Sequence, residues 1–173
     1  MKAFNICVKR GLDIFFDATP LVNMVPRSIL NSILKATSIL FINIDELRML
    51  TGKLSINESL SELKSTVKGI IVVKLGDRGA LAYHDDIISR VDGVKVIPID
   101  TTGAGDAFNA AFIYGYMRGL SIEHSLYLAN IVGALTVERF GAGVNLPMKR
   151  DIEAFIKLRN LRCDDKIWRL ISE

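Results

Sequence analysis

The chain has 173 residues, and its 22 Lys and Arg residues outnumber its 19 Asp and Glu residues by only three. This small, scattered excess argues against nucleic-acid binding, and no apolar run approaches the length of a membrane span. The two cysteines, Cys7 and Cys163, have neither metal-ligand spacing nor a disulfide framework, and the first ten residues lack the apolar region of a signal peptide. We therefore expect a cytoplasmic protein that binds neither nucleic acid nor membrane.

The first part of the chain is predicted to alternate between helices and buried strands. The expected elements are a helix over 2–10, a strand over 12–16, a helix from Pro26 to about Lys35 and a strand over 38–42. The hydrophobic content of 50% fits buried parallel strands, and it also fits a surface that contacts another protein.

Asn43 follows the second strand directly, and Glu46 stands three residues later. Asn43 is a good helix N-cap, and Glu46 would complete a capping box with it. This pattern explains both residues without any ligand. The helix should end at Gly52, and another is expected over 57–68, with its apolar residues on one face.

The residues Ile70–Leu75 form a β-branched run that is typical of a central parallel strand. The segment Gly76–Gly79 then turns the chain into 80–84, and its glycines suit a hairpin turn with positive φ. Lys74, at the strand end, is either a solvated terminus or a side chain that reaches a phosphate. Two further short strands are expected over 87–91 and 94–97.

The most informative stretch is Asp100-Thr101-Thr102-Gly103-Ala104-Gly105-Asp106, which leads into a strong helix-forming segment. A helix from Asp106 to about Met117 would leave its first amide groups without intrahelical partners. Together with the helix dipole, these amides form a site for an anion, and Asp106 would stand at its edge. The simpler interpretation is that Asp106 only caps a helix after a glycine-rich turn.

Two known phosphate-binding motifs do not fit this stretch. A Walker loop requires Lys after the last glycine, and a dinucleotide fingerprint requires a third glycine where Phe108 stands. The rest of the chain is expected to form a helix from Ser121 through Ala134, a loop over 140–145 and a helix that starts around Pro147 and Asp151. A charged tail is expected from Leu158, with Trp168 and Leu170 as anchors.

The seven residues from Asp100 to Asp106 resemble the signature of the ribokinase family, the phosphofructokinase-B type sugar kinases, whose consensus is Asp-Thr-x-Gly-Ala-Gly-Asp. The resemblance continues through 108–112, 129–130 and 139–142. It implies a ribokinase-like three-layer α/β/α sandwich with a mostly parallel sheet. It also implies ATP-dependent phosphoryl transfer to a hydroxyl of a sugar or related small molecule such as a nucleoside. Asp106 would be the catalytic base, and the amides of Gly103, Ala104 and Gly105 would form the anion hole.

The resemblance also implies the cofactors and the residues that hold them. Glu46 would act on Mg²⁺ through water, and Asp100 and Thr102 would belong to a monovalent-cation site suited to K⁺. The expected nucleotide-site residues are Asn43, Glu46, Lys74, Gly76, Gly79 and Asn130.

The resemblance covers only the C-terminal, nucleotide-binding part of the family, because nothing here corresponds to the substrate-side Gly-Gly motif or the lid. We therefore expect residues 1–173 to form one α/β domain that is truncated at its N-terminal side. The alternative to an active kinase is a catalytically incomplete nucleotide-binding fragment, or one part of a split kinase. In either case the truncated sheet edge would be covered by self-association into a homo-oligomer or by a partner.

Overall fold

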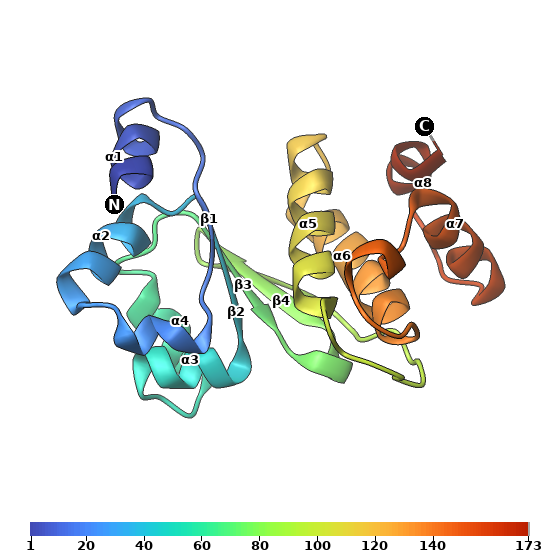
Figure 1. Cartoon of the computed structure of the whole chain (residues 1–173), viewed down its shortest axis with the longest axis horizontal. Coiled ribbons are helices and arrows are strands. Elements are labelled where there is room, and N and C mark those ends of the chain that lie inside the picture. Colours follow the sequence, from blue (N-terminus) through green and yellow to red (C-terminus); the bar gives the residue numbers. More distant parts are fainter. Residues whose placement is uncertain (173) are drawn as a thin grey trace. The chain divides into compact units, whose positions relative to one another are not determined.

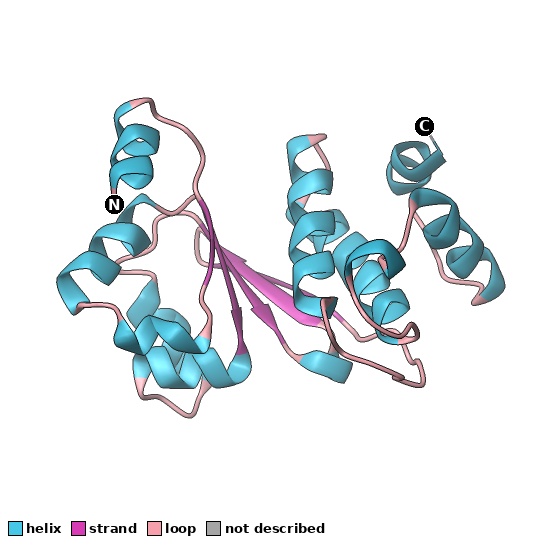
Figure 2. Ribbon diagram, in the orientation of Figure 1, coloured by secondary structure: helices cyan, strands magenta, loops and turns pink. Residues whose placement is uncertain are grey.

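The computed structural model describes residues 1–172, and the chain folds into two compact units. Unit 1 comprises Met1–Leu75 and Leu81–Ile88, and unit 2 comprises Gly76–Ala80 and the chain from Ser89 onward. Figure 1 labels the elements along the chain, and Figure 2 distinguishes helices from strands. In the part of the chain that is described, no helix combines the length and the apolar character needed to cross a bilayer.

Five strands form one sheet in the order β1-β2-β3-β4-β5. They are β1 (Phe15–Asp17), β2 (Ile39–Asn43), β3 (Ile70–Lys74), β4 (Ala80–His84) and β5 (Ile87–Val91). The first three run parallel, with Phe15 opposite Ile39 and Asn43 opposite Lys74. The register brings the carboxyl ends of β2 and β3 level with one another, and polar residues gather at this edge.

Unit 1 covers one face of its strands with helices (Figure 1). These are α2 (Arg27–Ala36), α3 (Ile44–Thr51) and α4 (Ile56–Leu63), with the short 3₁₀ helix η1 (Pro20–Met24) beside α3. The four apolar residues of β2 are at most 1% exposed, which is the pattern of a parallel strand buried on both faces. In contrast, α1 (Lys2–Lys9) contains no buried residue, and the three residues of the edge strand β1 are only half-buried.

Unit 2 is built mainly from helices. It contains η2 (Gly76–Arg78), α5 (Ala104–Met117), α6 (Ile122–Val137), η3 (Gly143–Asn145), α7 (Lys149–Leu158) and α8 (Asp165–Ser172). Ile131 of α6, Ile156 of α7 and Ile167 of α8 are each at most 1% exposed and lie in one core.

Several predicted boundaries are wrong. The helix expected from Asp106 begins at Ala104, because Gly103 takes a left-handed conformation and ends the loop there. The strand expected over 94–97 does not form, since Val94 and Val96 instead pack against the core of unit 2.

Two further differences from the prediction concern the end of α4 and the C-terminal tail. The helix expected over 57–68 ends at Leu63, whose carbonyl accepts hydrogen bonds from Thr66 and Val67 in a closing turn. The expected charged tail contains α8, whose buried Ile167 and Leu170 anchor it to the core of unit 2.

Candidate functional site

The N-terminus of α5 is open. Its first intrahelical bond runs from the Ala107 N–H to the Gly103 carbonyl at 2.9 Å, and no side chain caps the helix. The Ala104 N–H donates to the Thr101 carbonyl at 3.2 Å. Within residues 1–172, the amides of Gly103, Gly105 and Asp106 have no hydrogen-bond acceptor. These amides and the positive end of the helix dipole can receive an anion.

Gly103 is required at this N-terminus for two reasons. Its φ of 77° lies in the left-handed region, which costs a residue with a Cβ about 1–2 kcal/mol. A Cβ on Gly103 would also lie 2.9 Å from the Cβ of Ala142. The loop that contains Ala142 therefore lies in close contact with residues 100–103, which we call the signature loop.

Asp106 stands in the first turn of α5 with an exposed side chain. The position beside the open amides is the one that the sequence predicted for the base. A carboxylate near a helix N-terminus is also stabilised by the dipole.

Asp100 forms hydrogen bonds within the signature loop and to Gly141. Its Oδ1 accepts hydrogen bonds from the N–H of Thr102 at 2.9 Å and from the Thr102 hydroxyl at 2.6 Å. Its Oδ2 accepts a bond from the Gly141 N–H at 2.9 Å. These bonds, led by that of the Thr102 hydroxyl, hold the pKa of the Asp100 carboxyl below its usual value.

In unit 1, the predicted capping box at Asn43 is confirmed. The Asn43 Oδ1 accepts from the N–H groups of Asp45 and Glu46, both at 2.9 Å, and the Glu46 Oε2 accepts from the Asn43 N–H at 2.8 Å. Glu46 is only 8% exposed, and this burial raises the pKa of its carboxyl, with the Asn43 N–H and Lys74 opposing the shift. The bonds leave one Glu46 oxygen for another partner.

Lys74 pairs with a residue that sequence reasoning did not assign to the site. Its Nζ lies 3.1 Å from the Asp17 Oδ1. Asp17 ends β1 and Lys74 ends β3, the two parallel neighbours of β2, which ends at Asn43. Ligands of open α/β sheets bind outside these strand ends. The signal for Asp17 in the sequence was its position directly after a buried strand.

A second group of site residues comes together in unit 2. A Cβ on Gly79 would lie 2.1 Å from the Val91 carbonyl oxygen, and a Cβ on Gly93 would lie 1.9 Å from the Asp77 carbonyl oxygen. The glycine turn and the segment 91–93 therefore touch backbone to backbone. The Asn130 Nδ2 donates to the Asp92 carbonyl at 2.6 Å, so α6 is tied to the same segment. Sequence reasoning missed Gly93, whose role depends on this contact.

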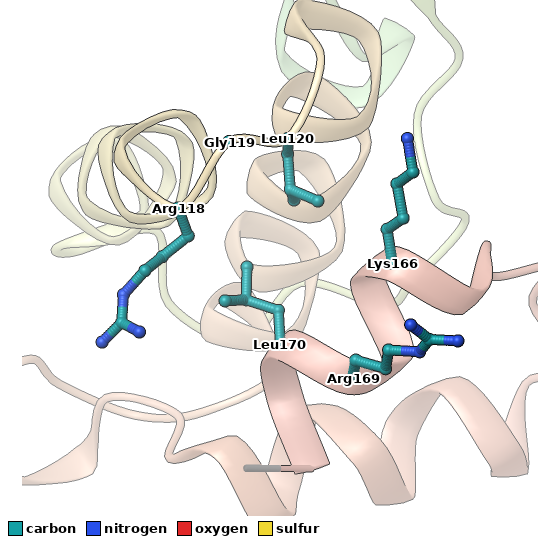
Figure 3. A pocket seen from close by; sticks show the side chains of 6 residues that line it. All are labelled: Arg118, Gly119, Leu120, Lys166, Arg169 and Leu170. Carbon is teal, nitrogen blue, oxygen red and sulfur yellow. The ribbon is translucent and has the colours of Figure 1, made fainter.

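A surface pocket of about 250 Å³ lies at the other end of α5 from Asp106. It is lined by Arg118, Gly119, Leu120, Lys166, Arg169 and Leu170. Figure 3 shows its three cationic side chains pointing away from one another around the two leucines. The pocket contains none of the predicted site residues.

Of the predicted site residues, Asn43, Glu46 and Lys74 belong to unit 1, and the others belong to unit 2. Among the described residues, no cluster of three or more His, Cys, Asp or Glu side chains is arranged to hold a metal ion.

Comparisons with known proteins agree with the signature. A ribokinase of Lactococcus lactis is 33% identical over 101 residues, which cover 58% of this chain and 34% of the relative. A nucleoside kinase of Methanothermobacter thermautotrophicus is 32% identical over 137 residues, which cover 79% of this chain and 43% of the relative. The chain thus spans about a third to a half of these curated relatives.

The solved structures give the same picture of the fold. A candidate ribokinase II of E. coli, in complex with ATP and Mg²⁺, matches with a TM-score of 0.81 and 30% identity, over 91% of this chain and 52% of that one. The fold is therefore ribokinase-like, and the predicted α/β class is confirmed. The sequence model of the pfkB family of carbohydrate kinases matches residues 2–149, and the chain belongs to this family.

Proposed function

We propose that this chain carries the phosphoryl-transfer site of an ATP-dependent kinase that acts on a hydroxyl of a sugar or nucleoside. The observation that carries the proposal is the open N-terminus of α5, beside the exposed Asp106 carboxylate. There the amides of Gly105 and Asp106 have no acceptor among the residues that the structure describes. The family supplies the reaction class, since its members are carbohydrate kinases.

In the proposed reaction, the acceptor oxygen attacks the γ-phosphorus of ATP while the bond between that phosphorus and the β,γ-bridging oxygen breaks. Asp106 takes the proton of the hydroxyl, and ADP leaves. General-base catalysis of this kind contributes about 10²–10⁴-fold in rate. The amides at the α5 N-terminus stabilise charge on the transferring group, and losing one such donor typically costs about 3–4 kcal/mol.

Mg²⁺ would neutralise phosphate charge in this reaction. Hard cations prefer oxygen ligands, and the carboxylates of Glu46 and Asp17 at the strand ends of unit 1 supply them, with Glu46 acting through water. The candidate ribokinase II of E. coli that matches this fold was solved in complex with ATP and Mg²⁺, which supports both as ligands here. A K⁺ ion beside Asp100 and Thr102 stays a prediction.

The nucleotide would be held by the junction of the glycine turn with segment 91–93. Gly76 and Gly79 leave the turn without side chains, and Asn130 fixes the neighbouring backbone through Asp92. We therefore propose that Asn130 shapes the nucleotide site through the Asp92 carbonyl, in addition to any direct contact. Lys74 is proposed as a charge near the phosphates that Asp17 holds in place.

The experiment that tests the proposal compares Asp106→Asn with the unsubstituted chain. The variant should lose about 10²–10⁴-fold in turnover and keep its affinity for ATP, because the amide side chain cannot accept the proton. Glu123→Gln is the matched control, since Glu123 also lies in the first turn of a helix of unit 2. Retained turnover in Asp106→Asn would contradict the assignment of Asp106 as base.

A second candidate is that residues 1–173 form the C-terminal nucleotide-binding domain of a kinase and act only with another polypeptide. The observation that favours it is the matched length of about a third to a half of the curated relatives. The half-buried edge strand β1 and the unburied α1 are the surfaces that a partner or a second copy would cover.

Two measurements separate the two candidates. The first is calorimetry with ATP, with and without Mg²⁺. The second is ATP consumption over a panel of sugars and nucleosides. ATP binding with turnover supports the kinase, and ATP binding without turnover supports the incomplete part. Neither binding nor turnover would contradict both.

A further inference from the structure

The carboxylate of Asp100 joins the signature loop, residues 100–103, to the loop between α6 and α7, residues 138–148. We call the latter the second loop. Asp100 binds Thr102 within its own loop through Oδ1, and it binds the Gly141 N–H through Oδ2. Asp100 and Gly141 are 41 residues apart in the sequence. We call these three residues, Asp100, Thr102 and Gly141, the Asp100 latch.

Neighbouring contacts hold the same two loops together. The N–H groups of Ile99 and Asp100 donate to the Val137 carbonyl at 2.7 and 3.2 Å. Gly103, the N-cap of α5, leaves no room for a Cβ beside Ala142, the residue after Gly141. A displacement of the second loop would therefore act directly on the residue at which α5 begins.

The second loop is braced from its other side. The Asn145 Nδ2 donates to the Phe140 carbonyl at 2.9 Å, and Arg139 lies 3.2 Å from the Asp151 Oδ2 at the start of α7. The Asp151 Oδ2 also accepts a bond from the Met148 N–H at 2.9 Å. The loop that contains Gly141 is thus tied to α7 through the contact of Arg139 with Asp151.

We propose that Asp100 is a positioning residue that holds the amides of Gly103, Gly105 and Asp106 in the geometry needed to receive phosphate. The inference rests on the proposed function for the identity of the anion. The link between Asp100 and the N-terminus of α5 rests on the latch geometry. Asp100 acts through Thr102 and Gly141 and need not touch the nucleotide. A misplacement of about 1 Å at such a site can cost about 10²-fold in rate.

The substitution Asp100→Asn should remove one bond of the latch, the one between Asp100 and the Gly141 N–H. An asparagine offers one acceptor oxygen and one NH₂ group in place of two acceptor oxygens. Thr102 presents two donors and Gly141 presents one, so the oxygen will face Thr102 and the NH₂ group will face the Gly141 N–H. The turn within the signature loop is then kept, and the link to the second loop is lost.

The test measures amide hydrogen exchange and nucleotide affinity on the full chain at neutral pH. In Asp100→Asn, exchange of the Gly141 amide should become at least about tenfold faster, while that of Val137 and other α6 amides stays unchanged. Affinity for ATP should fall about tenfold, as expected for losing one hydrogen bond to a charged group, and affinity for AMP should not change. Asp164→Asn changes a carboxylate of the same unit that accepts a bond from the Lys166 N–H at 2.8 Å, and this variant should behave like the unsubstituted chain.

Both measurements are made in KCl and in tetramethylammonium chloride. A latch predicts the faster Gly141 exchange in both salts, and a change seen in KCl alone would show that Asp100 acts as a cation ligand and overturn the proposal. Unchanged Gly141 exchange, or equal losses for ATP and AMP, would also overturn it. If the unsubstituted chain does not bind ATP, the proposed function fails, whereas the exchange measurement still decides whether the latch exists.

Discussion

The N-termini of α3 and α5 are chemically alike as backbone, and the chain treats them in opposite ways. In α3, the side chain of Asn43 takes two of the free amides, and Glu46 returns a bond to the Asn43 N–H. In α5, the N-cap is Gly103, which has no side chain to offer, and the amides of Gly105 and Asp106 remain without acceptors in the part of the chain that is described. One helix end is closed by its own sequence, and the other is left open.

The difference shows how a helix end is assigned to stability or to binding. Unpaired amides at a helix N-terminus cost free energy unless water, a side chain or a ligand satisfies them. A capping box removes that cost and also removes the anion site. At α5 the glycine offers these amides no side-chain acceptor, and the Asp100–Gly141 bond and the close approach of Ala142 flank this N-terminus.

The largest expected effect comes from straining the open N-terminus with Gly103→Ala. Alanine at a φ of 77° should cost about 1–2 kcal/mol of unfolding free energy, and the contact with the Ala142 Cβ should add to this cost. ATP affinity should fall as well, because the amides of α5 would shift. Urea denaturation and calorimetry measure the two effects.

Gly119→Ala is the matched control for this variant. Gly119 lies in the same unit with a φ of 83°, and a Cβ there would meet nothing within 4 Å. It should show the backbone cost alone and no loss of ATP affinity. Equal losses of stability in the two variants would argue against the contact between Gly103 and Ala142.

A smaller effect is expected from opening the closed helix end with Asn43→Ala. Loss of the two bonds that Asn43 accepts should lower the unfolding free energy by about 0.5–2 kcal/mol. Urea denaturation measures it, and Asn43→Ser, which retains an acceptor, should recover most of the loss. A variant as stable as the unsubstituted chain would show that the capping box contributes little.

The smallest effect is expected for Glu46→Gln. Burial raises the pKa of Glu46 in the folded chain, so its ionisation costs the folded state free energy. Relative to the glutamine variant, the unsubstituted chain should therefore lose stability as the pH rises through that pKa. We expect the variant to gain stability relative to the unsubstituted chain as the pH rises.

Urea denaturation of both forms between about pH 4 and 7 tests this prediction. If the unsubstituted chain gained stability relative to the variant over this range, the folded pKa of Glu46 would be lowered and the assigned cause would be wrong.

Short-range features of the molecule were predictable from the sequence. The capping box of α3 depends only on residues three apart, a spacing that helix geometry brings together in any context. The β-branched residues of β3 indicated a buried strand, and the glycines of the signature indicated the loop before α5. The family followed from the signature for the same reason, since its seven residues are consecutive.

Only the tertiary structure decided the contacts that join distant residues. Lys74 meets Asp17 across 57 residues, Asn130 meets Asp92 across 38, and Asp100 meets Gly141 across 41. Strand register and helix packing set these pairs, and neither follows from local spacing. The sequence by itself therefore predicted which residues would carry the chemistry of an anion site. The packing of loops and strands determined which of those residues support one another.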